Sequence, residues 1–332
     1  MNRPILAITL GDPAGIGPEV ILKALSYAEV YDQCRPLVIG DRRILERAMP
    51  WVDHSAFQYD IVSSPAAGKY KTGVITLLDL ENADPVAIPP GKIGPNAGRA
   101  AVEYVFCACD LAMNGEVDAV VTAPLNKEAM NLAGFHFAGH TELLTERTGA
   151  TKVSMLLTGP KLRVVHVSTH VSLQEAIQRV TKKRVEEVID LAYHSCVALG
   201  IAEPRIAVAG LNPHASEGGL FGDQEAREVI PAVQSARSRG FNVSDPLPGD
   251  TVFLRAVKGE FDIVVAMYHD QGHIPMKLLA FDSGVNVSIG LPIIRTSVDH
   301  GTAFDIAGTG QAREESMLAA IDVAVKMALA KQ

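Results

Sequence analysis

Cysteine is scarce in this sequence, and the few cysteines do not form a metal-binding or disulfide pattern. Four occur among 332 residues, and their spacings match neither a zinc ribbon nor a disulfide framework. Cys107 and Cys109 fall on different faces of a predicted helix, which favours buried free thiols. The sequence therefore gives no support for a structural zinc site or a cross-linked scaffold.

Positive charge is scarce as well. The chain has 30 Lys and Arg against 38 Asp and Glu, a formal net charge of −8. This balance argues against nucleic acid as the main partner. An anionic small molecule can still bind, provided that the protein concentrates its cations locally.

The first apolar run is short. It begins at Pro4 and meets Gly-Asp-Pro after seven residues. That length is too small for a membrane-spanning helix, and no small-residue cleavage site follows. We therefore expect a cytoplasmic protein with no membrane partner.

The sequence does contain a regular alternation of short apolar runs, rich in Val, Ile and Ala, with longer helical patterns. Most of the runs are continuous, as in strands covered on both faces, which predicts a mostly parallel α/β sheet with right-handed crossovers. The length of the chain predicts two lobes, with the C-terminal end returning to the first. The predicted strands are residues 5–10, 36–39, 74–78, 119–122, 153–157, 162–168, 205–210, 262–267 and 285–289, and the main predicted helices are 98–114, 182–199, 223–239 and 314–330.

Three histidines follow three different predicted strands: His170, His214 and His269. In an open α/β sheet, ligands bind at the carboxyl edge of the strands. Three imidazoles meeting there could hold a catalytic divalent cation with one position left open. The alternative, that each is a hydrogen-bonded turn residue, stays open. His166 is interpreted as a core histidine, and His273 as a neighbour of the ligand His269 or a substrate contact.

Two loops are polar or glycine-rich. "LGDPAGIGPEV" (residues 10–20) follows a strand and opens a helix, with Pro18 and Glu19 suited to the first turn. It matches neither nucleotide-binding fingerprint, so it is either a phosphate nest or a tight turn. "RTSVDHGTAFDIAG" (residues 295–308) packs many polar groups after an apolar strand, which indicates either a polar ligand or a solvated loop.

Several of these segments resemble one known family. "GDPAGIGPE", "TAPLNKEA", "GHTELL", "NPHASEGGLFGDQE", "MYHDQGHIPMK" and "GLPIIRTSVDHGTAFDIAG" are similar to the 4-hydroxythreonine-4-phosphate dehydrogenases, over essentially the whole chain. The first and last also resemble isocitrate and isopropylmalate dehydrogenases. The resemblance implies a two-lobed, non-Rossmann α/β fold with residues 1–130 plus 295–332 as the first lobe and 131–294 as the second. It also implies a homodimer with active sites at the subunit interface.

The resemblance assigns roles to particular residues of this chain. The implied metal ligands are His170, His214 and His269. The implied substrate-binding residues are His140, Thr141, Lys277, Asn286 and Arg295. The implied cofactor-binding residues are Gly301, Thr302 and Asp305. The resemblance leaves the proton acceptor open: Asp250 and Asp270, which should lie near the metal, and Lys127 are candidates, and helix capping explains either aspartate equally well.

The implied activity is the oxidation and decarboxylation of a 4-phosphorylated four-carbon hydroxy acid by NAD or NADP. A divalent metal, which could be zinc, cobalt, nickel or magnesium, would lower the pKa of the substrate hydroxyl as hydride leaves. The biosynthetic members read Gly-Leu-Pro where this chain has Gly272-His273-Ile274-Pro275, which favours a sister branch acting on D-threonate or D-erythronate 4-phosphate. The alternatives are a metal-dependent hydrolase or lyase on a phosphorylated sugar acid, and a non-catalytic phosphosugar binder.

Overall fold

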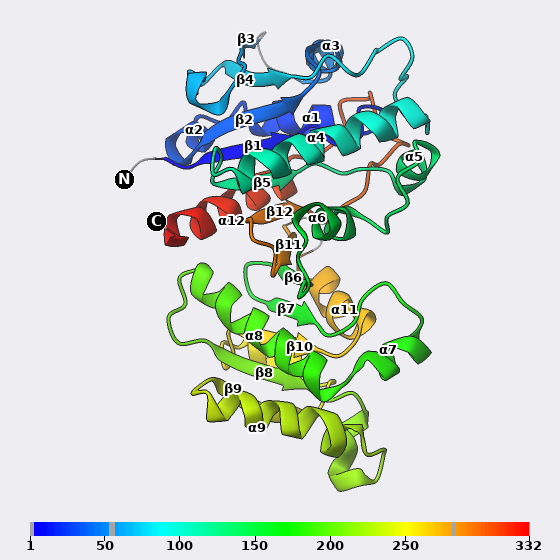
Figure 1. The fold of residues 1–332 in the computed structure, drawn as a ribbon, viewed down its shortest axis with the longest axis vertical. Coiled ribbons are helices and arrows are strands. Elements are labelled where there is room, and N and C mark those ends of the chain that lie inside the picture. Colours follow the sequence, from blue (N-terminus) through cyan, green and yellow to red (C-terminus); the bar gives the residue numbers. More distant parts are fainter. Residues whose placement is uncertain (1–2, 53–56, 281–282, 332) are drawn as a thin grey trace. The chain divides into compact units, whose positions relative to one another are not determined.

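The structure, a computed structural model, describes residues 3–52, 57–280 and 283–331. The chain forms two compact units, Met1–Thr151 with Leu291–Ala330, and Lys152–Gly290. Figure 1 shows the C-terminal helix packed in the unit that contains the N-terminus, so the last segment returns to the first unit. Within the described residues, no helix is long and apolar enough to cross a membrane.

The sheet of the first unit is parallel throughout its pairings. Its strands lie in the order β3-β4-β2-β1-β5-β12. They are β1 (Ile5–Thr9), β2 (Arg35–Gly40), β3 (Gln58–Ile61), β4 (Val74–Asp79), β5 (Ala119–Thr122) and β12 (Arg295–Val298). Every residue of β1 and β5 is buried, which accounts for their continuous apolar sequences.

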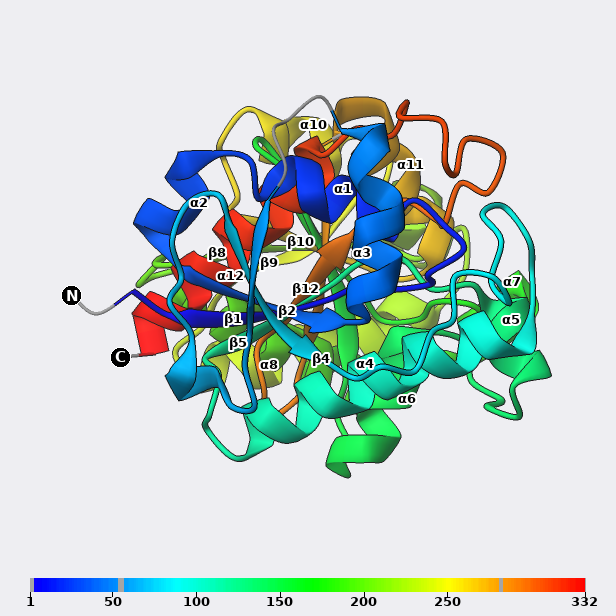
Figure 2. The ribbon, with the colours of Figure 1, turned by 90° about the horizontal axis from the view of Figure 1, so that it is seen from above.

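Helices cover both faces of this sheet. They are α1 (Gly17–Ala24), α2 (Ala28–Gln33), α3 (Arg42–Ala48), α4 (Pro95–Met113), α5 (Lys127–Leu132), α6 (His140–Thr148) and α12 (Glu315–Lys331), with short 3₁₀ turns η1 (Met49–Trp51) and η2 (Pro65–Ala67). In Figure 2, α4 lies on one side of β1 and β2, while α1 and α3 lie on the other. Because α5 and α6 both pack against α4, the first unit continues to Thr151 rather than ending at the predicted residue 130.

The second unit has a mixed sheet, in the order β11-β6-β7-β10-β8-β9. Its strands are β6 (Ser154–Thr158), β7 (Arg163–His166), β8 (Arg205–Ala209), β9 (Asn242–Leu247), β10 (Ile263–Ala266) and β11 (Val285–Ile289). The pairs β11–β6 and β6–β7 are antiparallel, and the rest are parallel. The expectation of mostly parallel sheets is therefore confirmed for both units.

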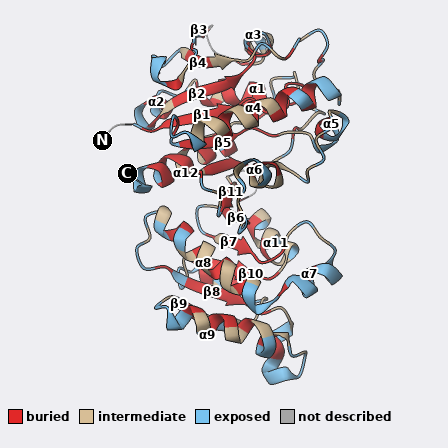
Figure 3. Ribbon diagram, viewed as in Figure 1, coloured by how far each residue is buried: buried red, intermediate tan, exposed pale blue. Residues whose placement is uncertain are grey.

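The helices of the second unit are α7 (Leu173–Arg179), α8 (Lys182–Ala198), α9 (Ile230–Ser238), α10 (Val252–Val257) and α11 (His269–Ala280), with the irregular turns η3 (Pro213–Gly219) and η4 (Glu225–Val229). Figure 3 shows that the buried residues concentrate in the strands and on the helix faces toward them. One buried cluster joins β6, β7, β8 and β10 to α10 and α11. It packs α11 against the sheet through Met276 and Ala280.

Three strands were not predicted from the sequence, β3, β9 and β12. None of the four residues of β3 is buried, and β9 contains an Asp-Pro pair that is tolerated at a sheet edge.

The cysteines follow the prediction, since all four are free and three are buried, with Cys107 half-buried.

Candidate active site

Three neighbouring parallel strands of the second unit, β7, β10 and β8, end at the same edge of the sheet. His166 is the last residue of β7, and His170 follows it in a left-handed conformation, with φ 49°. His269 begins α11 just after β10. His214 follows β8 and is also left-handed, with φ 55°. Parallel pairing therefore delivers all these imidazoles to the edge where α/β proteins bind ligands.

Three of these rings and that of His273, one turn further along α11, form one group, which we call the histidine cluster: His166, His170, His269 and His273. The rings of His269 and His273 stack with centroids 3.6 Å apart. The His170 and His269 centroids are 5.7 Å apart, and those of His166 and His273 are 4.7 Å apart. His166 is fully buried, as predicted for a core histidine, and burial together with the neighbouring imidazoles lowers its pKa to about 3. It is therefore neutral at physiological pH.

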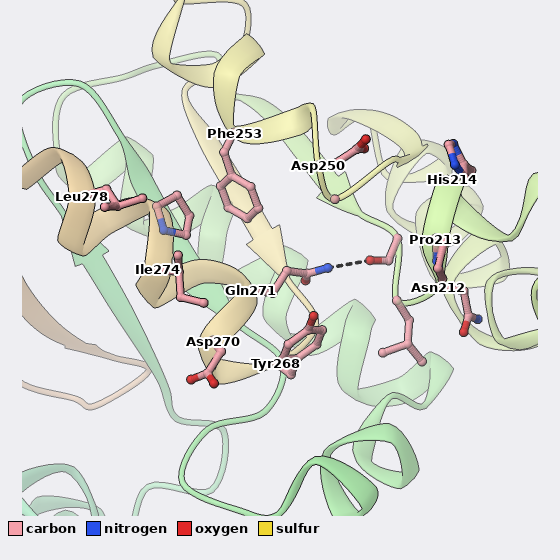
Figure 4. A pocket seen from close by; sticks show the side chains of 14 residues that line it. Asn212, Pro213, His214, Asp250, Phe253, Tyr268, Asp270, Gln271, Ile274 and Leu278 are labelled. Carbon is pink, nitrogen blue, oxygen red and sulfur yellow. Dashed lines mark hydrogen bonds between the residues drawn. The ribbon is translucent and has the colours of Figure 1, made fainter.

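His214 does not belong to the histidine cluster. It lines a pocket of about 610 Å³ at the ends of β8 and β10, where Figure 4 places His214 and Asp270 on opposite sides. Gln271 spans the floor of this pocket by donating from Nε2 to the backbone oxygen of Gly210, at 2.7 Å. The other lining residues include Asn212, Pro213, Asp250, Phe253, Tyr268, Ile274, Pro275 and Leu278.

A second pocket of about 510 Å³ contains the other two predicted ligands. His170 and His269 both line it, from the loop after β7 and the start of α11. Tyr268 and Asp270 line both pockets. The Asp270 carboxylate lies 2.7 Å from Nδ1 of His269, so it fixes the orientation of that ring.

Within one chain, only two of the three predicted ligands are close enough to share a metal ion. Two imidazoles bound to one ion have centroids roughly 5 to 6 Å apart, given metal–nitrogen bonds of about 2.0 Å. The His170–His269 pair, at 5.7 Å, meets that condition. Among the residues that the structure describes, however, no three His, Cys, Asp or Glu side chains lie together so as to hold a metal. The third predicted ligand, His214, lines the other pocket and not the one that holds the His170–His269 pair.

A different kind of cluster lies in the first unit, around His140 at the start of α6. Burial, and then the positive charges of Arg295 and Lys127, hold the pKa of His140 well below its usual value. Its Nε2 atom is buried and has no hydrogen-bond partner among the described residues. Arg295 is buried on β12 and donates to Oγ1 of Thr122 at 2.7 Å. Burial lowers the pKa of this guanidinium to about 9, so it stays charged at neutral pH.

This first-unit group, which we call the anion cluster, consists of His140, Lys127 and Arg295. Two cations beside a neutral imidazole suit a phosphate or carboxylate, which the guanidinium can hold by charge-assisted hydrogen bonds. The remaining predicted substrate-binding residues are distributed over both units. Thr141 is in the first unit on α6, whereas Lys277 on α11 and Asn286 on β11 belong to the second.

Comparison with known proteins identifies the family. The sequence matches the model of the pyridoxal phosphate biosynthetic protein PdxA over residues 32–324. The chain belongs to the PdxA family. It is 50% identical over 326 residues to a D-threonate 4-phosphate dehydrogenase of Cupriavidus necator, which covers 98% of this chain and 97% of that protein. Membership of this family makes the chain a dehydrogenase.

Solved structures agree with this assignment. A crystal structure of a 4-hydroxythreonine-4-phosphate dehydrogenase from Klebsiella pneumoniae superposes with a TM-score of 0.89 at 46% identity, over 98% of this chain and 100% of that one. A β-decarboxylating dehydrogenase from Thermococcus kodakarensis gives a TM-score of 0.52 at 15% identity, over 98% of this chain and 82% of that one. The second match concerns the fold alone, and it confirms the expected relation of PdxA proteins to the decarboxylating dehydrogenases.

The predicted cofactor loop of this PdxA-family chain lies between β12 and α12. Its backbone at Gly301 is exposed, and a Cβ at that position would meet nothing within 4 Å. Asp305 is exposed as well, whereas Thr302 is buried. The backbone at Gly301 and the Asp305 carboxylate are therefore accessible to a polar ligand.

The N-terminal glycine loop differs from the predicted cofactor loop in its hydrogen bonding. Its backbone amides donate to the protein itself: Asp12 to Pro124 O at 2.8 Å, Gly15 to Asp12 O at 3.0 Å and Ile16 to Thr302 O at 3.1 Å. Because these amides are already satisfied and the segment is buried, the loop is a tight turn and not a phosphate nest. Through the Ile16 amide it also supports the segment between β12 and α12.

Sequence reasoning missed Asp12 as a residue of interest. Its Oδ1 accepts from the amide of Ala14 at 2.8 Å, and its buried Oδ2 has no partner among the described residues. Burial raises the pKa of this carboxyl to about 6. The signal available in the sequence was an acid between glycine and proline directly after a buried strand.

Proposed function

We propose that this protein is a nicotinamide- and divalent-metal-dependent dehydrogenase that oxidises and decarboxylates D-threonate 4-phosphate or D-erythronate 4-phosphate. The observation that carries the proposal is the His170–His269 pair, whose spacing suits a shared cation, at the carboxyl edge of the sheet in a PdxA-family chain. Support for the substrate comes from the Cupriavidus necator relative, whose name specifies D-threonate 4-phosphate.

The anion cluster would bind an acidic group of the substrate. Arg295 is held rigidly by Thr122 and buried, so its guanidinium is already oriented before a ligand arrives. The neutral His140 can donate or accept a single hydrogen bond, and Lys127 adds a second positive charge. Such preorganised groups favour a phosphate or carboxylate over a neutral group.

The histidine cluster would hold the metal through His170 and His269. When bound, the ion would supply positive charge that favours ionisation of the substrate hydroxyl during hydride transfer. Asp270 would keep the His269 ring in its ligating orientation, which makes it a poor candidate for the proton acceptor. Asp250, which lines the His214 pocket, and Lys127 remain the candidates for that role.

The third imidazole would come from a second copy of the chain, in a homodimer with active sites at its interface. His214 lines a pocket beside Ile274 and Leu278, which are exposed apolar residues, and Leu220 and Phe221 nearby in sequence are exposed as well. Exposed apolar side chains concentrated near one pocket favour a protein–protein contact there. In such a dimer His214 of one copy would complete the His170–His269 pair of the other.

The direct test incubates the purified protein with a divalent metal, NAD or NADP, and each of three acids: D-threonate, D-erythronate and 4-hydroxy-L-threonine 4-phosphates. We expect the absorbance of reduced nicotinamide to rise fastest with one of the first two. Phosphate release or cleavage without any nicotinamide would instead indicate the hydrolase or lyase alternative. Binding without turnover would indicate a phosphosugar binder.

Mixing two inactive variants tests the dimer. His214→Ala and His269→Ala chains, unfolded and refolded together, would form mixed dimers with one intact site if the ligands come from different copies. We expect activity to return in the mixture and to be absent from a mixture of His170→Ala with His269→Ala. A monomer by analytical ultracentrifugation, or no recovery in the first mixture, would contradict the shared site.

A further inference from the structure

Helix α1 makes an unusual set of contacts through Lys23. Its ammonium donates to Oε1 of Glu19 at 2.9 Å and to the backbone oxygens of Gly310 at 2.8 Å and Ala312 at 2.6 Å. The same Glu19 oxygen accepts from the amide of Ala312 at 2.8 Å. All three donors of the ammonium are therefore used, and two of them reach a segment remote in sequence.

The burial of Glu19 distinguishes this pair from an ordinary helix ion pair. The Glu19 side chain is inaccessible to solvent, whereas Lys23 keeps 18% of its side-chain exposure. Exposed pairs spaced i to i+4 contribute little to stability. A buried carboxylate must keep its partners, because losing them leaves a charge without compensation. Because the pair also binds Gly310 and Ala312, it constrains that remote segment and not only helix α1.

The segment that it fixes is the stretch from residue 299 to 314, which contains neither helix nor strand. This stretch includes the predicted cofactor loop. Near its beginning, the amide of Ile16 donates to Thr302 O, and near its end Lys23 and Glu19 bind Gly310 and Ala312. The glycine loop and α1, which are continuous in sequence, therefore hold it at two points.

Trp51 lies against the same stretch. A Cβ at Gly308 would be 3.3 Å from Cζ2 of Trp51, and one at Gly310 would be 3.2 Å from its backbone oxygen. Gly310 is left-handed, with φ 78°, a conformation that glycine adopts without strain. Trp51 is the single tryptophan of the chain, so the tryptophan fluorescence comes from this position alone.

We propose that Glu19 and Lys23 form a clamp that holds residues 299–314 in the conformation that binds the nicotinamide cofactor. This inference rests on the proposed function. The two side chains contact the loop rather than the ligand, so they are positioning residues. If loss of the clamp lowers the binding-competent population to about a tenth, the apparent cofactor affinity falls about tenfold.

Two variants separate positioning from folding. Lys23→Met removes the ammonium and leaves the buried Glu19 carboxylate without its positively charged partner, so it lowers both stability and cofactor affinity. The double variant Glu19→Gln with Lys23→Met removes both charges and is expected to recover most of the thermal stability. Cofactor affinity should stay low in the double variant, because Gly310 and Ala312 still lack the ammonium. Lys326→Met, which breaks the exposed Asp322–Lys326 pair on α12, is the matched control.

Three measurements are made on each variant: Trp51 fluorescence without ligand, hydrogen exchange at the Ala312 amide, and KM and kcat with the cofactor varied. We expect altered fluorescence, faster exchange and a KM about tenfold higher with kcat within about twofold, a split typical of lost ground-state binding. Recovery of both stability and cofactor KM in the double variant would overturn the clamp, as would unchanged exchange in Lys23→Met. Wild-type protein that binds neither NAD nor NADP would instead refute the proposed function, and the exchange data, collected without cofactor, distinguish the two failures.

Discussion

The two units each hold an imidazole whose pKa is depressed, but they surround it with opposite neighbours. In the first unit, His140 sits among the cations Arg295 and Lys127. In the second, His166 lies beneath other imidazoles, one of which, His269, contacts the carboxylate of Asp270. A neutral histidine beside cations suits an anion, and a group of imidazoles beside a carboxylate suits a metal cation. The same residue type thus lies in two different electrostatic environments, which favour ligands of opposite charge.

The largest expected effect comes from a change in the histidine cluster. His269→Ala removes one of the paired imidazoles, and we expect turnover to fall by at least about a hundredfold, because changes to the outer partners of ligands alone cost that much. Metal content by mass spectrometry should fall in parallel. His194→Ala, at an exposed position on α8, is the control and should change neither quantity. Full activity in His269→Ala would show that the histidine cluster does not hold a catalytic metal.

The next effect is at the anion cluster. Arg295→Met leaves a similar volume without charge, and we expect the KM for the phosphorylated substrate to rise by about a hundredfold, as for loss of a buried charge pair. The KM for the cofactor should change far less. Steady-state kinetics with each substrate varied in turn would show it. An equal rise in both constants would mean that Arg295 acts on folding and not on the anion.

A smaller effect tests the partner of His269. Asp270→Asn keeps an oxygen near the ring but removes the charge, so metal affinity should fall by about ten- to a hundredfold while substrate binding changes little. Competition with a metal chelator measures it. If Asp270 is instead the proton acceptor, excess metal would not restore turnover, and the pH profile would lose one limb.

The smallest effect is on stability, at Asp12. Its folded pKa of about 6 is raised above the ordinary 3.8, so the folded state binds this proton more tightly than the unfolded state. Stability should therefore fall as the pH rises from about 4 to about 6 and stay level above, by about 3 kcal/mol at most. Asp12→Asn cannot ionise and should lack this component. Urea unfolding of both proteins at pH 4 and pH 7 tests it, and identical pH dependence would contradict the shift.

The sequence predicted the parts of the fold that depend on local pattern. Continuous apolar runs located the buried strands β1, β5 and β10, and the resemblance supplied the relation to decarboxylating dehydrogenases. Edge strands such as β9 were missed because a strand with one unpaired side tolerates polar residues and proline, so its pattern is weak.

Within the candidate site, the approach of residues to one another was predictable only where parallel topology determines it. His170 and His269 come together because β7 and β10 are neighbours that end at one edge. The position of His214 could not be predicted, because it depends on left-handed backbone from His214 to Gly218. The environment of His140 depends on Arg295, which long-range pairing of β12 with β5 places in the same unit.

Tyr268 and Asp270 form a shared wall between the two pockets of the second unit. A ligand in one pocket that displaces these two residues therefore changes the shape of the other pocket as well. An inhibitor that pushes the start of α11 from the His214 side would also disturb the His170–His269 pair. A compound in the larger pocket, which His214 and Asp250 also line, would thus act on the proposed metal pair through Tyr268 and Asp270.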